Sequence, residues 1–271
     1  MRGWKTKTGF AAALLLMGAV MMAQPPLQTQ AAVRKQTESA VGVKAGGSST
    51  GLTGSEKEQE TEETVLAVMM YSYSDHAGTN RNVQRACNAI DGITVSPGTV
   101  FSYNNTLGRR TKENGYVMAP SYAGAETEET IGGGICRIST ALYNTALRSN
   151  MTILERHPHT KEVDYSRGGL DAAVTDGVQD FRFRNDLTVS VTIHAQYDEY
   201  GYVVWMTAQE EDAGERRYDP WSEKIEDGWY RAYLSIYENG KLAYTRSLGE
   251  SYYWGSRMEN RSVAEKENQR G

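Results

Sequence analysis

The chain has 271 residues, and its 34 Asp and Glu outnumber its 29 Lys and Arg, which gives a formal net charge of −5. An acidic chain disfavours nucleic-acid binding, because phosphate recognition needs a basic surface. Its two cysteines are too few for a disulfide framework. A single bridge between Cys87 and Cys136 stays open on the sequence alone.

The first 32 residues have the pattern of an export signal. Arg2, Lys5 and Lys7 precede an apolar run of about 13 residues, and small residues follow at 29–32. A membrane-spanning helix needs about 20 apolar residues, so a cleaved signal peptide is favoured over an uncleaved membrane tether. We therefore expect an exported, extracytoplasmic protein.

Two further segments lack the large apolar side chains that a core needs. Residues 33–64 are rich in Ser, Thr, Gly, Glu and Gln, which predicts a disordered linker. Residues 257–271 are charged and predict a frayed tail. The residues between them are enough for one hydrophobic core. We divide them into a main domain, 65–195, and a C-terminal β extension, 196–256.

Two segments have the apolar spacing of amphipathic helices. The first begins near a capping residue at Thr79 or Asn80, and its apolar stripe is Val83, Ala86, Cys87 and Ile90. Cys87 is therefore expected to be a small core residue. The second runs from Ile135 to about Asn150.

The rest of the pattern predicts antiparallel strands. Residues 93–104 predict two short strands about a Pro-Gly turn. Period-two alternation predicts a meander over 181–208, with Val191, Ile193 and Val203 on one face.

The C-terminal part adds a hairpin. After a polar break at 210–223, residues 231–247 predict a hairpin that turns at Asn239-Gly240. The expected fold is α+β: an antiparallel sheet with two main helices, one entered through a Gly-Gly-Gly turn, plus a C-terminal β-hairpin region.

Three consecutive glycines, Gly132, Gly133 and Gly134, precede the second helix. Such a turn lets a backbone or a ligand approach closely, and it leaves the first N–H groups of the helix unpaired, where anions bind. Cys136 would lie in the first helical turn, where the helix dipole and Arg137 favour thiolate over thiol. The sequence predicts either a reactive thiol at the mouth of a helix or a tight structural turn around an inert cysteine.

A thiol nucleophile needs a base and a group that orients the base. His157 and His159 follow Cys136 by about 20 residues, and an extended segment would put both on one face. Asp171 and Asp180 are the candidate orienting groups. Cys136 and the two histidines would also suit a catalytic zinc ion, but their spacing is a weak metal signal. We expect no metal and no other cofactor.

Five segments in fixed order, FSYNNTLGRRTKENGYVMAP, GGGICRISTALYNTAL, ERHPH, GLDAAV and DFRFRN, resemble the VanW family of exported bacterial proteins, named after an accessory protein of vancomycin-resistance gene clusters. The resemblance covers about residues 65–195. The family's helix motif reads Gly-Gly-Gly-X-Cys-Gln-X-Ser-Thr, and here Arg137 replaces the Gln. The other matching positions are Gly132, Gly133, Gly134, Cys136, Ser139, Thr140, Leu142, Tyr143, Asn144, His157, Pro158, His159, Asp171, Asp180 and Asn185.

The resemblance implies a place in the cell wall or at the outer face of the cytoplasmic membrane, with peptidoglycan or its stem peptides as the partner. The candidate substrate-binding residues belong to the helix motif and to the Arg109-Arg110 turn, which could pair with acidic groups of a wall peptide. They are Gly132, Gly133, Gly134, Arg137, Ser139, Thr140, Tyr143, Asn144 and Arg109.

Two classes of function fit these residues best. The first is a cysteine-dependent peptidase, amidase or acyl-transfer enzyme, in which Cys136 attacks a carbonyl, a histidine is the base and helix N–H groups stabilise the oxyanion. The second is a non-catalytic envelope-binding or scaffolding module that uses the same cleft for a peptide carboxylate. A Cys/His metal-dependent hydrolase is a third alternative. An open thiol within reach of a histidine favours the first class.

Overall fold

The structure, a computed structural model, describes residues 63–123, 126–209 and 216–256, all of which belong to one compact unit. The predicted signal peptide and tail lie outside the described residues, as does the predicted linker except for Glu63 and Thr64, which open a strand. Within the described ranges, no helix is long and apolar enough to cross a membrane.

The largest sheet is antiparallel, with the strand order β1-β9-β8-β2. Its strands are β1 (Glu63–Ser72), β9 (Gly201–Gln209), β8 (Val191–Tyr197) and β2 (Ile93–Val95). Ile193 pairs with Met206, and Ala195 pairs with Val204. Directly paired residues share a face, so Val204 and not Val203 lies on the face of Ile193. Val203, one residue earlier, lies on the opposite face, so its predicted placement is wrong.

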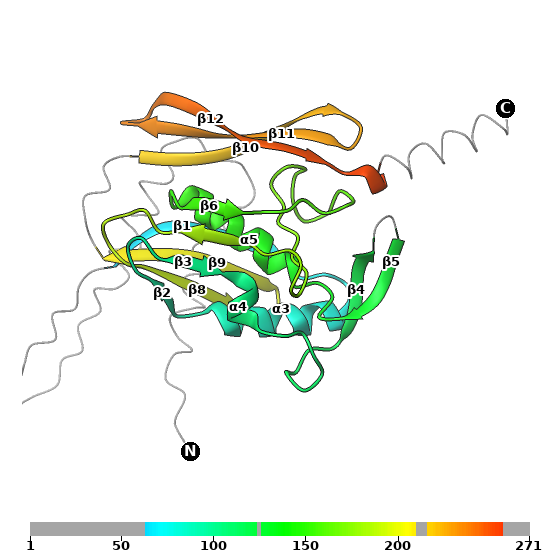
Figure 1. Ribbon diagram of the computed structural model, residues 1–271. Helices are drawn as coiled ribbons and strands as arrows, with labels where there is room; N and C mark the ends of the chain where they lie inside the picture. The colour runs from blue at the N-terminus through cyan, green and yellow to red at the C-terminus, as the bar shows by residue number, and fades with distance from the viewer. Residues whose placement is uncertain (1–62, 124–125, 210–215, 257–271) are drawn as a thin grey trace, which may run out of the picture. The chain divides into compact units, whose positions relative to one another are not determined.

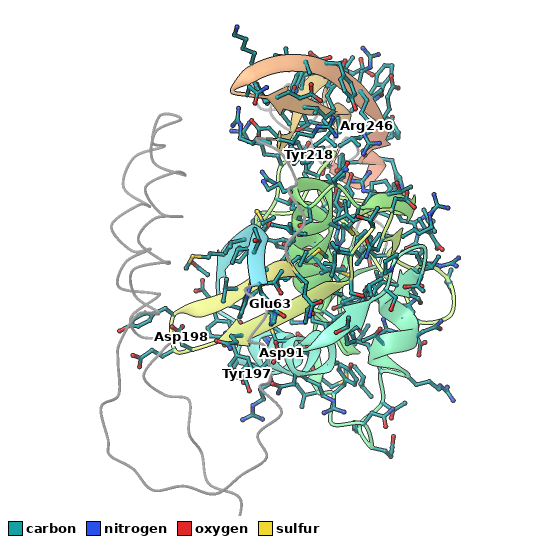
Figure 2. All side chains as sticks on the ribbon, turned by 90° about the vertical axis from the view of Figure 1, so that its left-hand side faces the viewer. Glu63, Asp91, Tyr197, Asp198, Tyr218 and Arg246 are labelled. Carbon is teal, nitrogen blue, oxygen red and sulfur yellow. The ribbon has the colours of Figure 1, made fainter. Side chains whose placement is uncertain are left out.

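The two predicted helices are α3 (Ala77–Ile90) and α5 (Cys136–Arg148), and a short α4 (Tyr103–Leu107) lies between them in the chain. The predicted apolar stripe of α3 is buried, but its N-cap is His76, whose Nδ1 accepts a hydrogen bond from the Thr79 N–H at 3.2 Å. The C-terminal end of α3 is fixed to β8 because Asp91 Oδ1 accepts from the Ala195 N–H at 2.9 Å; Figure 2 labels Asp91 near this sheet.

Two smaller sheets flank α5. One contains β3 (Val100–Ser102), β7 (Arg182–Arg184) and β6 (Thr152–Glu155), and the other is the hairpin of β4 (Met118–Ala123) and β5 (Glu126–Ile131). The predicted meander is therefore divided, because β7 pairs with β3 and β6 while β8 and β9 pair with each other.

The C-terminal sheet has the order β10-β11-β12 (Figure 1), with β10 (Arg216–Glu226), β11 (Trp229–Glu238) and β12 (Lys241–Tyr252). The hairpin turn at Asn239-Gly240 is confirmed, and both residues have positive φ, 50° and 74°. The predicted polar break was too long, since β10 begins at Arg216.

One core joins the parts. Helix α5 contacts β1 and β9 of the largest sheet and β10 of the C-terminal sheet. Ala232, Leu234 and Ile236 of β11 belong to the same buried cluster as α3, α5, β8 and β9. The α+β class with antiparallel sheets is confirmed, and the C-terminal sheet is part of the core rather than an appendage.

Candidate active site

The three glycines before α5 are fixed by two constraints. Gly132 and Gly134 have φ of 84° and 90°, a region that side-chain-bearing residues avoid. Gly133 is needed for close packing, because a Cβ there would lie 2.1 Å from the Ala119 carbonyl oxygen of β4. The turn therefore presses the start of α5 against the β4–β5 hairpin.

Helix α5 begins at Cys136, and Ile135 at its N-cap provides no side-chain hydrogen bond. The N–H groups of Arg137, Ile138 and Ser139 donate to the carbonyls of Gly134 and Ile135, so the first turn closes on itself. Within the described residues, the N–H groups of Gly134 and Cys136 make no hydrogen bond. The start of the helix therefore has fewer free N–H groups than the sequence suggested, namely those of Gly134 and Cys136.

The side chains of Cys136, His159 and Asp171 are grouped together at the start of α5. His159 lies close enough to the Cys136 thiol for its ring to lower the pKa of that thiol, and His159 Nδ1 lies 2.6 Å from Asp171 Oδ2. Since Nδ1 faces Asp171, Nε2 is the nitrogen left for the thiol. Cys136 Sγ also contacts the backbone of Val174, whose N–H lies 3.5 Å away. Cys136 is partly exposed, whereas His159 and Asp171 are buried.

Each of these three side chains shifts the pKa of its neighbour toward the charged form. Burial raises the pKa of the Cys136 thiol, but His159, the Val174 backbone and the Arg110 charge together lower it more, so the pKa falls below the usual 9.0. Burial lowers the pKa of His159, but its interactions with Asp171 and Cys136 raise it to about 9. Burial likewise opposes ionisation of Asp171, yet His159 and Arg156 hold its pKa at about 2. A carboxylate, an imidazolium and a thiolate are the mutually favoured forms.

Asp171 is fixed by two residues that the sequence analysis did not single out. Arg156 Nη2 donates to Asp171 Oδ1 at 2.6 Å, and the Tyr253 hydroxyl donates to the same oxygen. The His159 backbone N–H donates to Asp171 Oδ2 at 2.8 Å. Arg156 lies inside the ERHPH segment and could have been found as a charge partner for a buried carboxylate. Nothing in the sequence pattern pointed to Tyr253, which follows β12.

Three polar residues of α5 hold the segment that carries Asp171. Ser139 Oγ donates to the Ala172 carbonyl at 2.6 Å, and Thr140 Oγ1 accepts from the Ala172 N–H at 3.0 Å. Asn144 Nδ2 donates to the Leu170 carbonyl at 2.7 Å. All three are buried, as is Tyr143. These predicted substrate-binding residues therefore position the site from inside and are not placed to contact a substrate.

Two of the predicted catalytic residues lie elsewhere. The His157 ring bonds to Glu155 at 3.0 Å, because the chain leaves β6 at Glu155 and the two histidines are not on one strand face. Asp180 accepts hydrogen bonds from Ser102 Oγ at 2.5 Å and from the Asn104 N–H at 2.8 Å, which fixes the start of α4. The structure brings neither side chain to the thiol.

The Arg109-Arg110 turn is only half solvated. Arg109 is exposed, as a turn residue is expected to be. The Arg110 side chain is 5% exposed, lies 3.5 Å from Asp176 Oδ1 and packs its aliphatic stem over Gly132. Its charge also helps to lower the pKa of Cys136, after the larger contributions of His159 and Val174. Arg110 therefore adds a second cation near the thiol.

Two tyrosines flank the His159 ring edge-on. The ring centres of Tyr122 and Tyr165 each lie 6.2 Å from that of His159, and the Tyr165 hydroxyl lies 3.3 Å from Nε2. The Arg137 guanidinium lies over the ring of Tyr165, 4.3 Å from the ring centre. Arg137 and Tyr165 also line a cavity next to the site.

Neither a disulfide nor a metal cluster is formed by these groups. Both cysteines are free, and Cys87 is fully buried on α3. Among the residues that the structure describes, no three His, Cys, Asp or Glu side chains are grouped so as to hold a metal ion. Cys136, His157 and His159 in particular do not converge.

Comparison with known proteins gives a family and two curated relatives. Residues 78–206 match the family described as VanW like protein. The chain is 37% identical over 126 residues to the uncharacterized protein YoaR of Bacillus subtilis (strain 168), a match that covers 46% of this chain and 42% of YoaR. It is 24% identical over 188 residues to the vancomycin B-type resistance protein VanW of Enterococcus faecalis (strain ATCC 700802 / V583), covering 68% of this chain and 61% of that protein. The matches thus span less than two thirds of either relative. No solved structure matches the chain.

Proposed function

We propose that this chain, whose residues 78–206 match the VanW like protein family, is an exported cell-wall protein that uses Cys136 as a nucleophile on peptidoglycan stem peptides. The observation that carries this proposal is the grouping of Cys136, His159 and Asp171, in which His159 is bonded to Asp171 and acts on the Cys136 thiol. A thiol, a base and a carboxylate that orients the base are the three parts of a nucleophilic acyl-transfer site.

The first chemical step follows from the arrangement of these groups. The Cys136 thiolate attacks the carbonyl carbon of an amide, and a C–S bond forms as the carbonyl becomes a tetrahedral oxyanion. The His159 imidazolium then gives its Nε2 proton to the departing nitrogen as the C–N bond breaks. The products of this step are a thioester at Cys136, a free amine and a neutral imidazole, which Asp171 keeps oriented through Nδ1.

The second step regenerates the thiolate. Neutral His159 takes a proton from water, or from an acceptor amine, which attacks the thioester carbonyl. The C–S bond breaks, and His159 is again an imidazolium beside a thiolate. Water makes the site a peptidase or amidase, and an amine makes it an acyl-transfer enzyme. The unpaired N–H groups of Cys136 and Gly134 are available to stabilise the oxyanion in both steps.

The proposed setting and substrate rest on the relatives and on the N-terminal sequence. The Enterococcus faecalis relative is named for vancomycin B-type resistance, and the family resemblance implies association with the cell wall. The N-terminal apolar segment supports export. We choose stem peptides as the substrate because their amide bonds supply the carbonyl groups that a wall-associated thiolate would attack.

Turnover of wall fragments tests the proposal. The purified chain is incubated with soluble peptidoglycan fragments, and mass spectrometry follows the release of amines and shortened peptides. We expect release by the native chain and by Cys87→Ser, whose substitution lies in the core, and none by Cys136→Ser. Equal release by native and Cys136→Ser chains, or none by either, would contradict an enzymatic role.

One observation favours a second candidate, a non-catalytic envelope-binding module. The Tyr165 hydroxyl, 3.3 Å from His159 Nε2, shares the nitrogen that the thiol needs. In a binding module, this tyrosine would simply complete a polar cleft. Binding of wall fragments to Cys136→Ser with native affinity, together with no turnover by the native chain, would support this second candidate.

A further inference from the structure

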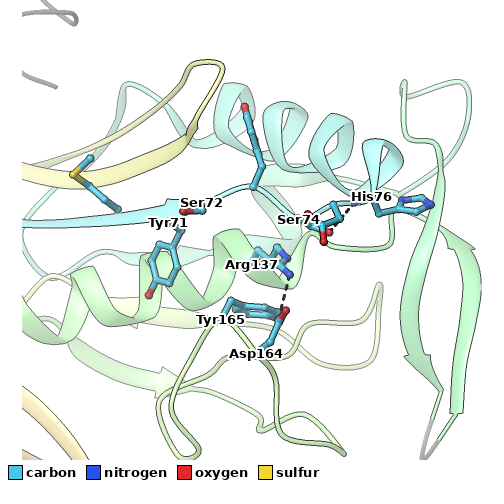
Figure 3. A pocket seen from close by; sticks show the side chains of 10 residues that line it. Tyr71, Ser72, Ser74, His76, Arg137, Asp164 and Tyr165 are labelled. Carbon is cyan, nitrogen blue, oxygen red and sulfur yellow. Dashed lines mark hydrogen bonds and ion pairs between the residues drawn. The ribbon is translucent and has the colours of Figure 1, made fainter. Parts of the chain in front are cut away.

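A cavity of about 640 Å³ lies beside the candidate active site, and Figure 3 shows the side chains that line it. Its walls are the end of β1, the segment before α3, and three residues that belong to or contact the site: Arg137, Asp164 and Tyr165. This volume is within the range of small-ligand sites. The cavity and the thiol share Tyr165, whose hydroxyl is at His159.

Arg137 is the one arginine or lysine among the described residues that line the cavity, and its side chain is 13% exposed. Its Nη2 donates to Asp164 Oδ1 at 3.2 Å, and the guanidinium lies over the Tyr165 ring. Asp164 is 79% exposed, so water screens this ion pair and it is weak. A guanidinium has five N–H donors, so Arg137 keeps donors for a further acceptor.

A buried hydroxyl, that of Tyr202, lies next to Arg137, although Tyr202 is not among the residues that line the cavity. Tyr202 of β9 is 3% exposed, stacks on Tyr71 of the cavity wall at 5.5 Å, and is close enough to Arg137 for that charge to act on its hydroxyl. Yet this buried hydroxyl makes no hydrogen bond of normal geometry. Buried polar groups without a partner are rare and call for an explanation.

We propose that this cavity is the subsite for a free C-terminal carboxylate of the peptide bound at Cys136, with Arg137 as the donor and Tyr202 as a residue that positions Arg137. A carboxylate accepts from a guanidinium at two positions, which matches the donors that Arg137 keeps beside its contact with Asp164. The two carboxylates that also line the cavity, Asp75 and Asp164, are exposed, so their repulsion is screened.

The position of this subsite sets where the peptide would be cut. Arg137 Cζ lies 4.3 Å from the centre of the Tyr165 ring, and the hydroxyl of that ring lies 3.3 Å from His159 Nε2. An extended peptide advances about 3.3 Å per residue. The carboxylate would therefore lie within a few residues of the thiol. Resting on the proposed function, this makes the protein a carboxypeptidase-type enzyme that removes a short C-terminal fragment.

Protection of Cys136 from alkylation measures binding at this subsite without requiring turnover. The probes are N-acetyl-alanyl-alanine, with L- or D-alanine at the C-terminus, and the corresponding C-terminal amides. The electrophile is iodoacetamide, which is uncharged. We expect the free acids to protect Cys136 at concentrations at least 10-fold lower than the amides. Equal protection by acid and amide, or protection by neither, would overturn the proposal.

Three substitutions locate the carboxylate. Arg137→Gln should weaken the binding of the acid by about 10- to 100-fold and leave the amide unchanged, because it removes one charge-assisted hydrogen-bonding group. Tyr202→Phe should weaken the acid severalfold, and Asp164→Asn should strengthen it severalfold because a competing carboxylate is removed. Arg167→Gln, at an exposed position of the same loop, is the matched control and should change neither. An Arg137→Gln chain that still prefers the acid would contradict the assignment.

Calorimetric titration of Cys136→Ser with the same acids and amides separates this proposal from the proposed function. If the native chain fails to turn over wall fragments but Cys136→Ser still prefers the acid and loses that preference with Arg137→Gln, the carboxylate subsite stands and only the catalytic role fails. If turnover occurs without any preference for the acid, the catalytic role stands and the subsite is wrong.

Discussion

Asp171 is the residue on which the candidate active site depends. Its carboxylate is fully buried and accepts hydrogen bonds from His159, Arg156 and Tyr253. A buried carboxylate is stable only where such partners offset the loss of hydration. The same contacts fix the orientation of the His159 ring. The stability of the site and its proposed chemistry therefore both depend on the hydrogen bonds of Asp171.

The pKa of Asp171 predicts an acid-dependent loss of stability. Its folded value is about 2 against an ordinary value of 3.8, so its stabilisation is present above about pH 4 and is lost as the pH falls toward 2. The shift corresponds to about 2 kcal/mol. Urea unfolding of the native chain between pH 2 and 6 should show this loss. Asp171→Asn should be less stable at pH 6, and its free energy of unfolding should fall less steeply as the pH is lowered (a flatter acid limb).

The matched control for this prediction is Asp186→Asn. Asp186 pairs with Arg184 at the surface, where ion pairs contribute little. It should leave both the stability at pH 6 and the acid limb close to those of the native chain. An acid limb in Asp171→Asn as steep as in the native chain would show that Asp171 is not held in its charged form.

At the scale of elements, the site is built from the start of α5 and the segment 170–174, which runs alongside it. The glycine turn sets the start of the helix, and Ser139, Thr140 and Asn144 tie the segment to the helix. Cys136 and Asp171 therefore come from two elements whose relative position is fixed by hydrogen bonds rather than by a flexible loop.

Gly133→Ala tests whether close packing sets the helix start. The new Cβ would meet the Ala119 carbonyl oxygen at 2.1 Å, so the hairpin or the turn must move, at a cost of about 3 kcal/mol. Gly177→Ala is the control, because nothing lies within 4 Å of its Cβ and only its positive φ costs about 1 kcal/mol. Urea unfolding compares the two. Equal costs would mean that Gly133 is not packed against β4.

Periodicity predicted the helices α3 and α5 and the hairpins β8–β9 and β11–β12, because each has a face that repeats in the sequence. It did not predict β10, because the Arg, Glu and Lys residues of this strand give a polar pattern that is typical of a loop, and only the folded chain shows their cross-strand pairs. Nor did it give the N-cap of α3, since His76 is not a common capping residue.

The site was predictable in residue type but not in choice of partner. The glycines and Cys136 mark one point in the sequence, whereas His157 and His159, like Asp171 and Asp180, are equivalent until the chain is folded. The path of the chain after β6 decides between them, because it sends His157 to Glu155 and His159 to the thiol. Side-chain hydrogen bonds such as that of Tyr253 leave no periodic signal.

At the scale of the whole described unit, the C-terminal sheet completes the site. Tyr253 follows β12, and its hydroxyl donates to Asp171 and accepts from the Gly169 N–H at 2.6 Å. Ser251 of β12 accepts from Arg156 Nη1 at 2.6 Å. Both residues lie beyond the family match, which ends at residue 206. The matched segment therefore does not contain all the residues that hold its own candidate site.

Tyr253→Phe tests this dependence. Loss of the hydroxyl leaves Asp171 and the Gly169 N–H each short of a buried partner, which should lower the free energy of unfolding by about 1–3 kcal/mol. Tyr244→Phe, at a residue that is 57% exposed, should change it by less than about 0.5 kcal/mol. Chemical unfolding measures both. If the two substitutions have the same small effect, the C-terminal sheet does not support the site.

The central claim, that His159 and Asp171 make Cys136 a nucleophile, is tested most directly by the pH dependence of alkylation. Cys87→Ser leaves Cys136 as the single thiol, and peptide mapping after iodoacetamide treatment gives its rate between pH 5 and 10. The account predicts a midpoint clearly below the ordinary thiol pKa of 9.0. In His159→Gln the midpoint should rise, because burial is then opposed only by the smaller contributions of Val174 and Arg110. A folded native chain whose Cys136 stays inert up to about pH 9, or whose midpoint is unchanged by His159→Gln, would contradict the claim.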